Sequence, residues 1–133
     1  MQPRVDDKSI SDDERLWRRI VPSNVFTKVD KDGNLRPSSA AFLDGITGEV
    51  SVCRACLTSV DKVLENYQQQ GLVEINAKLP RSLGHIVVAD PQEEDLSHAL
   101  ICPPPDSSYN RRKKDARIIA DKAEWLVKPV MAS

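Results

Sequence analysis

Residues 85–105 have the sequence HIVVADPQEEDLSHALICPPP. The runs at 85–89 and 98–102 are apolar and rich in β-branched residues, which is typical of strands. Pro91 ends the first run, because the residue before a proline is held in an extended conformation. The three prolines at 103–105 close the second run. This segment therefore predicts two strands joined by an acidic loop.

Further strands are expected on both sides of this segment. Five runs are aromatic, β-branched or alternately apolar and polar, as strands are. They are residues 16–21, 25–29, 50–52, 72–77 and 124–127. The Asp-Gly pair at 32–33 enters a tight turn with little strain, so it predicts a hairpin after the second of these runs.

Two segments have the pattern of a helix. In the first, apolar residues recur at the helical spacing i, i+3, i+4 and i+7. They are Val60, Val63, Leu64 and Tyr67. Thr58 or Ser59 would cap this helix, and Gly71 would end it, because glycine adopts the left-handed conformation of a helix C-terminus without strain. The second helix is expected at about 110–122.

This order of elements, with strands before, between and after two helices, predicts an α+β fold. We expect a curved, mainly antiparallel sheet of about five to seven short strands with two helices. Residues 15–129 would form a single domain and residues 130–133 a C-terminal tail. Residues 1–14 hold five acidic and two basic residues with few large apolar ones, so they predict a disordered acidic tail.

Composition and charge narrow the class of protein. The chain has 133 residues, 40% hydrophobic and 29% charged, which is the size and balance of one globular domain. A net charge of −1 argues against a protein devoted to nucleic acid or membrane surfaces. No apolar run reaches the roughly 18 residues of a membrane span. The acidic N-terminal residues are unlike a signal peptide. Three cysteines, an odd number, favour reduced thiols over disulfides. We therefore expect a cytoplasmic location.

Cysteine and histidine residues supply one four-ligand combination. Cys53 and Cys56 form a C-x-x-C motif, and His98 and Cys102 are spaced so that they share one face of a strand. The number of ligands matches a structural Cys₃His zinc site. However, the C-x-x-C motif is not followed by the tight turn that aims both thiolates at a metal. The favoured interpretation is that the three cysteines are small buried hydrophobic residues and that no metal is bound.

Arginine, serine and histidine residues supply a candidate phosphate or dinucleotide site. Guanidinium groups bind phosphate oxygens in bidentate fashion, and hydroxyls add neutral hydrogen bonds. The candidate cofactor-binding residues are Arg19, Arg36, Ser38, Ser39 and Arg81, and the candidate catalytic residues are His98 and Ser39. None of the five glycines falls in a phosphate-binding loop. The alternative, which is favoured, is that the arginines are ordinary surface residues and the serines form a turn.

A basic run at Arg111–Lys114 is the third candidate. Together with Arg117, this run gives five basic residues and one acidic residue, Asp115, at the start of the second expected helix. Aromatic residues for base stacking are lacking beyond Tyr109. We expect a solvated helix face rather than a nucleic-acid site.

Short motifs spread over the folded part carry a family resemblance. They are LWRRI at 16–20, RPSSAAF at 36–42, RSLG at 81–84, DP at 90–91, HALI at 98–101 and AEWLVKP at 123–129. Through them, residues 16–129 resemble a group of small, stand-alone bacterial proteins of unassigned function. This resemblance implies a single domain but no particular activity.

The chain is also similar, at the level of the fold, to ADP-ribosyltransferase-like domains. That resemblance implies that Arg18 or Arg19 on the opening strand holds NAD and that Ser38, Ser39 or Ser51 takes a second position. The catalytic glutamate of such domains has no counterpart here. Because no catalytic motif is found, we expect a small bacterial binding or accessory protein that acts through protein–protein contacts. The alternative is an NAD- or phosphate-binding transferase.

Overall fold

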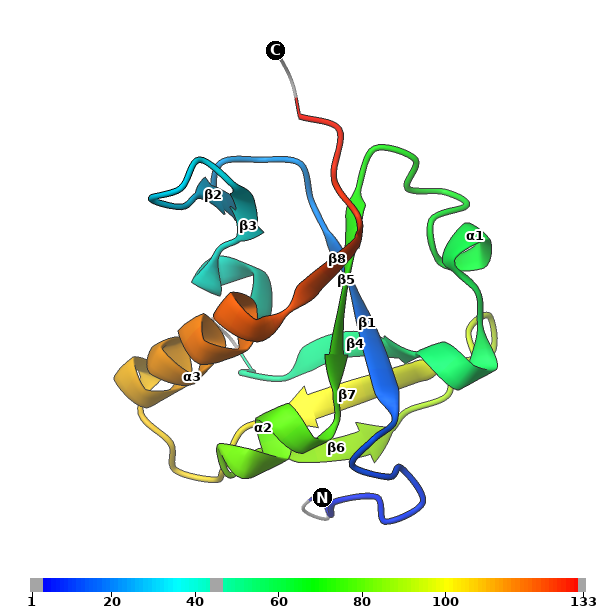
Figure 1. Cartoon of the computed structure of the whole chain (residues 1–133). Coiled ribbons are helices and arrows are strands. Elements are labelled where there is room, and N and C mark those ends of the chain that lie inside the picture. Colours follow the sequence, from blue (N-terminus) through cyan, green and yellow to red (C-terminus); the bar gives the residue numbers. More distant parts are fainter. Residues whose placement is uncertain (1–3, 44–46, 132–133) are drawn as a thin grey trace.

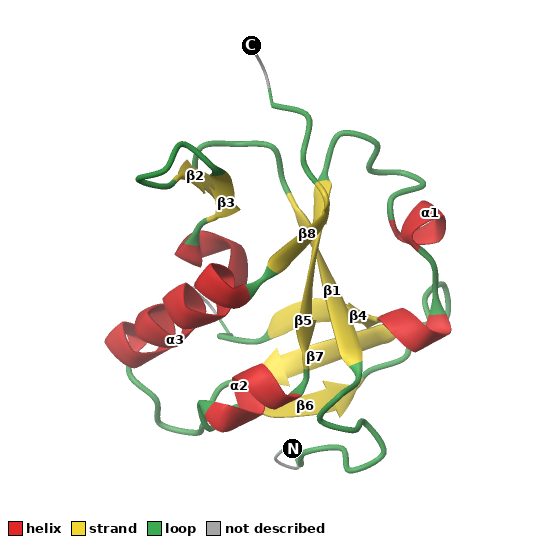
Figure 2. Ribbon diagram, in the orientation of Figure 1, coloured by secondary structure: helices red, strands yellow, loops and turns green. Residues whose placement is uncertain are grey.

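A computed structural model describes residues 4–43 and 47–131. Residues 1–3 of the expected N-terminal tail and 132–133 of the expected C-terminal tail lie outside the described residues. The described part contains a six-stranded antiparallel sheet, a two-stranded hairpin and helices placed against the sheet (Figures 1 and 2). The α+β class and the antiparallel sheet predicted from the sequence are confirmed.

The strands of the large sheet follow the order β6-β7-β4-β1-β5-β8. They are β1 (Arg15–Ile20), β4 (Val50–Arg54), β5 (Gly71–Asn76), β6 (Ile86–Ala89), β7 (His98–Cys102) and β8 (Glu124–Val127). The separate hairpin consists of β2 (Thr27–Val29) and β3 (Leu35–Pro37). The α-helices are α1 (Val60–Val63), α2 (Lys78–Ser82) and α3 (Tyr109–Lys122), and the 3-10 helices are η1 (Ser39–Phe42) and η2 (Ala55–Leu57).

The hairpin forms where the Asp-Gly pair predicts it. Gly33 has a positive φ of 83°, a conformation that costs glycine little. The Asp30 carboxylate accepts hydrogen bonds from the backbone N–H groups of Asp32 and Asn34, both at 2.9 Å. The turn is therefore fixed by one side chain and one glycine, both of which are local in sequence.

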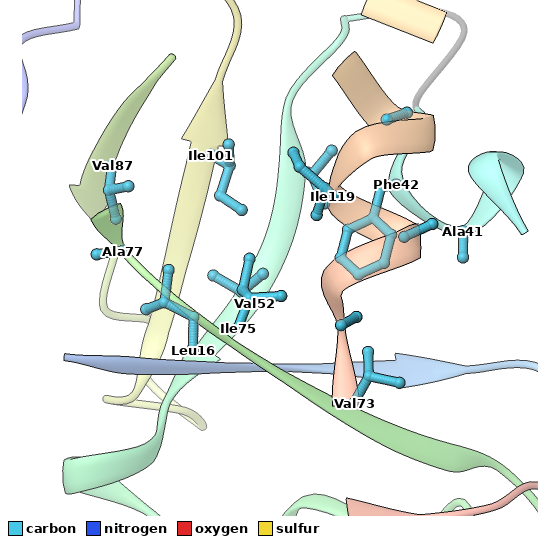
Figure 3. Packing of buried hydrophobic residues seen from close by; sticks show 14 of the residues in the cluster. Leu16, Ala41, Phe42, Val52, Val73, Ile75, Ala77, Val87, Ile101 and Ile119 are labelled. Atoms are coloured by element: carbon cyan, nitrogen blue, oxygen red, sulfur yellow. The ribbon is translucent and has the colours of Figure 1, made fainter. Parts of the chain in front are cut away.

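One face of the sheet carries the main hydrophobic core. Alternate side chains from the strands meet η1 and α3 there, as Figure 3 shows for Leu16, Val52 and Val73 against Phe42 and Ile119. On α3, the buried residues recur at helical spacing because only one side of the helix faces the sheet. They are Asp115, Ala116, Ile119 and Ala120.

The opposite face of the sheet has a thinner cover. A smaller cluster there consists of Cys53, Val63 and Leu72, with Trp17 and three other partly buried residues packed against it. The single turn of α1 supplies Val63, and α1 and α3 lie on opposite sides of the sheet (Figure 1). Much of this second face is therefore left to polar side chains.

The sheet divides between β1 and β4. These strands pair only at Leu16 with Arg54 and at Trp17 with Cys53, whereas β1 pairs with β5 along its whole length. Beyond Trp17 the two strands separate, and β4, β7 and β6 run across the direction of β1 and β5 (Figure 2). The Arg18 guanidinium bridges the gap by donating to the backbone oxygens of Ser51 and Ala41.

The first helix predicted from the sequence is much shorter than expected. Ser59 caps it, accepting from Lys62 N at 3.2 Å, but α1 ends at Val63. A helix of this length needs tertiary contacts, and Val63 is the one residue of α1 that is buried. Gly71 does not end a helix: it begins β5, where a side chain would meet Pro129 Cδ at 2.7 Å. The sequence pattern also did not predict α2.

Residues 4–14 differ from the predicted disordered tail. Ile10 is 1% exposed and belongs to the main core. The Asp6 carboxylate accepts from Val87 N at 2.9 Å and from Arg81 Nε at 3.0 Å, so this segment lies along the edge of β6. Burial raises the pKa of Asp6, but these two donors outweigh it and the net pKa lies below the usual value. Three of its acidic residues, Asp6, Asp12 and Glu14, are paired with distant arginines.

Candidate functional site

Two adjoining open cavities lie on the face of the sheet opposite α3. Their volumes are about 510 and 340 Å³, and they extend from α1 to the loop that joins β6 and β7. The residues that line both are Arg19, Cys53, Tyr67, Asp95 and His98. We call these two cavities together the trough.

Arg19 reaches the trough from β1, where it lies on the same face as Trp17. Its guanidinium carbon is 4.1 Å from the centre of the Tyr67 ring, a cation–π contact. Its Nη1 also donates to Val63 O, at a long 3.4 Å. The ion pairs among the described residues do not involve Arg19. Its position is thus fixed by an aromatic ring while most of its donors remain available to a ligand.

His98, at the start of β7, is oriented by Asp90. Its Nδ1 lies 3.0 Å from Asp90 Oδ2 and 3.1 Å from Asp90 O. Gln92 Nε2 donates to the same carboxylate oxygen at 2.9 Å, which holds Asp90 in place. In the neutral ring the proton belongs on Nδ1, where it can donate to Asp90, so Nε2 is left as an acceptor. The trough therefore contains an imidazole of fixed orientation.

Asp95 supplies a carboxylate on the opposite side of the trough from α1. Its Oδ1 accepts hydrogen bonds from Ser97 N at 3.0 Å and from Ser97 Oγ at 2.5 Å. Its Oδ2 lies 4.0 Å from Cys53 Sγ. One oxygen is thus occupied by the loop itself, and the other points toward the floor of the trough.

The buried thiols do not have the properties of nucleophiles or metal ligands. Burial raises the pKa of Cys53, and burial together with the charge of Glu49 raises the pKa of Cys102 to about 12. Both therefore stay protonated near neutral pH, and the thiolate is the reactive and metal-binding form.

The four zinc candidates do not come together. Cys53 lies opposite His98 in the sheet, but Cys102 is at the other end of β7, about 13 Å along the strand at ~3.3 Å per residue. Its Sγ donates to Glu49 Oε2 at 3.4 Å, and Cys56 is exposed in η2. Within residues 4–43 and 47–131, no group of three or more His, Cys, Asp or Glu side chains is placed to hold a metal ion.

Arg36, a candidate anion-binding residue, instead caps a helix. Its Nη2 donates to three backbone oxygens at the end of α3. They belong to Ala120, Asp121 and Ala123, at 3.0, 3.2 and 2.6 Å. The last carbonyls of a helix have no partner within it, and a cation also interacts favourably with the helix dipole there. The guanidinium of Arg36 is therefore used by the fold.

Three further candidates also lie away from the trough. Arg81 pairs with Asp6 at 3.0 Å and Asp12 at 2.9 Å, tying the N-terminal segment to α2. Ser38 Oγ donates to the backbone oxygen of Val25 at 2.6 Å. Ser39 begins η1, which packs against α3 on the other face of the sheet.

The trough brings together only part of the set predicted from the sequence. Arg19 and His98 share it, and the smaller cavity is also lined by Arg18 and Ser51, which the transferase-like resemblance singles out. Sequence reasoning missed Tyr67 and Asp95 as site residues. For Asp95 a signal is present: an Asp two residues before a Ser caps its own loop, which predicts an ordered carboxylate.

No protein-family model, curated protein or solved structure significantly matches the chain. In the described part of the chain, no helix has the length and apolar character needed to cross a lipid bilayer. The functional argument therefore depends on the geometry of the trough.

Proposed function

We propose that the chain is a small cytoplasmic binding protein whose trough receives an extended segment of a partner protein. The observation that carries this proposal is that Arg19, Asp95 and His98, each held by its neighbours, line one open depression. Pockets for small molecules and cofactors are usually concave and mostly apolar. The trough is open and lined mainly by polar side chains, so it differs from such a pocket.

Preorganisation of the polar groups supports a binding role. Arg19 is stacked on Tyr67, and Asp95 is bonded twice to Ser97. His98 is held by Asp90. Binding normally costs conformational entropy when side chains are immobilised. Here most of that ordering is already present in the folded chain, so contacts with a partner would retain more of their free energy.

Both edges of the large sheet are poorly suited to pairing with a strand of a partner protein, which favours the trough as the contact surface. The edge of β6 is covered, because Asp7 N donates to Val87 O and Asp6 accepts from Val87 N. The edge strand β8 has a register shift in its pairing with β5, and Pro129 lies two residues past its end. Irregular pairing and proline both hinder the addition of another strand.

A peptide-display selection tests the proposal. A random peptide library is selected on the full chain, and the enriched peptides are titrated by calorimetry into the wild type, Arg19→Gln, His98→Gln and the control Arg117→Gln. Arg117 is exposed on α3, away from the trough. We expect the two trough variants to bind about tenfold more weakly, and the control to bind like the wild type. A library that yields no binders, or binders that ignore both trough substitutions, would overturn the proposal.

A second candidate function is binding of NAD or a phosphate compound, as in a transferase. It is favoured by the shared position of Arg18, Arg19, Ser51 and His98 along one cavity. Thermal unfolding with NAD, ADP-ribose and inorganic phosphate tests it, since a ligand at 100 times its Kd stabilises a protein by about 2.7 kcal/mol. Stabilisation by one of these that disappears in Arg19→Gln would establish this function. No stabilisation at millimolar concentration would exclude it.

A further inference from the structure

The trough holds two opposite charges that do not neutralise each other. Arg19 and Asp95 both line its two cavities. Neither takes part in the ion pairs found among the described residues. Both charges therefore remain available to oppositely charged groups of a partner.

Each charge is kept in place by its own neighbours. The Tyr67 ring and the Val63 carbonyl hold the guanidinium of Arg19 toward α1. Ser97 holds the carboxylate of Asp95 over Cys53. The two side chains are thus fixed at opposite sides of the trough.

Cys53 lines both cavities together with Arg19 and Asp95, and both charges affect the pKa of its thiol. Burial is the main reason that the pKa of its thiol is raised. The charge of Asp95 raises that pKa further, and the charge of Arg19 lowers it. Both charges therefore act across the same floor residue, although they are too far apart to form an ion pair with each other.

Neighbouring residues extend the two charged ends. Lys62 lies beside Val63 and lines the larger cavity on the side of α1. Glu94 lies beside Asp95 and lines the same cavity on the side of the loop. Glu65, also in this cavity, offsets part of the positive charge near α1. The trough is thus polarised, with arginine at one end and two carboxylates at the other.

We propose that the segment bound in the trough carries an acidic residue that contacts Arg19 and a basic residue that contacts Asp95, both on the same side of an extended chain. This inference rests on the proposed function and names the class of partner segment. Side chains at i and i+2 of an extended segment lie on the same side, roughly 6.5–7 Å apart. Adjacent residues point to opposite sides, so they cannot both face the trough.

Two peptides of identical composition give a matched test. One is acetyl-Gly-Glu-Gly-Lys-Gly-amide, with the charges two positions apart, and the other is acetyl-Gly-Glu-Lys-Gly-Gly-amide, with the charges adjacent. Each is titrated into the isotope-labelled full chain and followed by NMR. We expect the first peptide to shift the amide signals of Arg19 and Asp95 and to bind about fivefold more tightly, the upper range for a part-exposed ion pair.

Substitutions then assign the two contacts. Arg19→Gln and Asp95→Asn each remove one charge, and the asparagine retains an oxygen that accepts from Ser97, so the loop keeps its bond. Each variant should bind the spaced peptide no better than the adjacent one. The control Arg117→Gln should keep the full preference.

The outcomes separate this inference from the function on which it rests. Equal binding of both peptides, or no saturable shift with either up to millimolar concentration, would overturn the inference. If peptides selected from the random library nevertheless bind in the trough, the proposed function stands without it. If those selected peptides also fail to bind, both proposals are wrong.

Discussion

Arg36→Met is the substitution that most directly separates the structural use of an arginine from its expected use as an anion ligand. The Arg36 Nη2 lies within hydrogen-bonding distance of three backbone oxygens at the end of α3, the closest being that of Ala123 at 2.6 Å. Ala120 and Ala123 are 0% and 1% exposed, so water cannot readily replace the guanidinium there. Methionine keeps most of the apolar stem and removes the donors.

The expected loss follows from the number of bonds. One Nη2 has two hydrogens, so at most two of the three contacts are strong. A hydrogen bond to a charged group contributes about 1.5–3 kcal/mol, and a buried carbonyl left without a partner costs about 1–3 kcal/mol. Allowing for partial rehydration, we expect a loss of about 3 kcal/mol in the free energy of unfolding. For a chain of this size that lowers the Tm by roughly 10 °C.

Urea unfolding followed by circular dichroism measures this loss. Arg36→Lys should lose less, about 1 kcal/mol, because an ammonium can still serve one carbonyl and the helix dipole. Arg117→Met, on the exposed side of the same helix, is the control and should remain within about 0.5 kcal/mol of the wild type. If Arg36→Met unfolds like that control, the capping role is wrong and Arg36 again becomes a candidate ligand residue.

Three other outcomes are expected. Iodoacetamide at mildly alkaline pH should modify Cys56 first, because the thiols of Cys53 and Cys102 are buried and have raised pKa values. Mass spectrometry measures the labelling of each cysteine, and equal labelling of all three would contradict the burial of the other two. The lowered pKa of Asp6 stabilises the fold above the ordinary aspartate pKa of about 3.9, and that stability is lost as the pH falls through the lower folded value. Asp6→Asn should therefore lose less stability than the wild type as the pH falls. The same dependence of stability on pH in both proteins would show that Asp6 makes no such contribution. His85→Leu should cost about 3 kcal/mol in urea, because it removes the 2.7 Å partner of the buried Asp115 carboxylate and leaves only Arg111 Nε at 3.6 Å. The double variant with Asp115→Leu should recover part of this loss, and purely additive losses would argue against coupling.

The strands and the long helix could be predicted because their signals are local. The runs at 98–102 and 124–127 coincide with β7 and β8, and the helix expected at about 110–122 is α3 to within one residue. In each case the apolar periodicity and the flanking prolines or caps lie within the element itself. The β2–β3 turn is another such case, since one aspartate and one glycine define it.

Features that depend on distant partners could not be predicted in this way. The acidic residues at the N-terminus have the composition of a solvated tail, yet Glu14 forms a bidentate pair with Arg54, 40 residues away, at 2.6 and 2.8 Å. The expected helix after Ser59 stops at Val63, and Leu64 and Tyr67 make their contacts with the smaller cluster and with Arg19 from positions past its end. Propensity predicts what a segment prefers, and tertiary contacts decide how much of it forms.

The residues of the candidate site also differ in whether local sequence or distant contacts determine their role. The sequence selected Arg19 and His98 by residue type, and the trough contains both. Arg36 and Arg81 were selected on the same grounds, but the fold uses their guanidinium groups to join segments. Tyr67 was assigned to a helix face because its spacing fits, whereas it lies past the end of α1 and stacks on Arg19.

The central claim is that the trough is the surface through which this chain binds another protein, with Arg19 as a principal contact. The most direct measurement is the Kd of the tightest library-selected peptide for the wild type and for Arg19→Gln, by titration calorimetry. We expect the Kd to rise about tenfold in Arg19→Gln and to stay within about twofold in Arg117→Gln. The same Kd for the wild type and Arg19→Gln would contradict the claim.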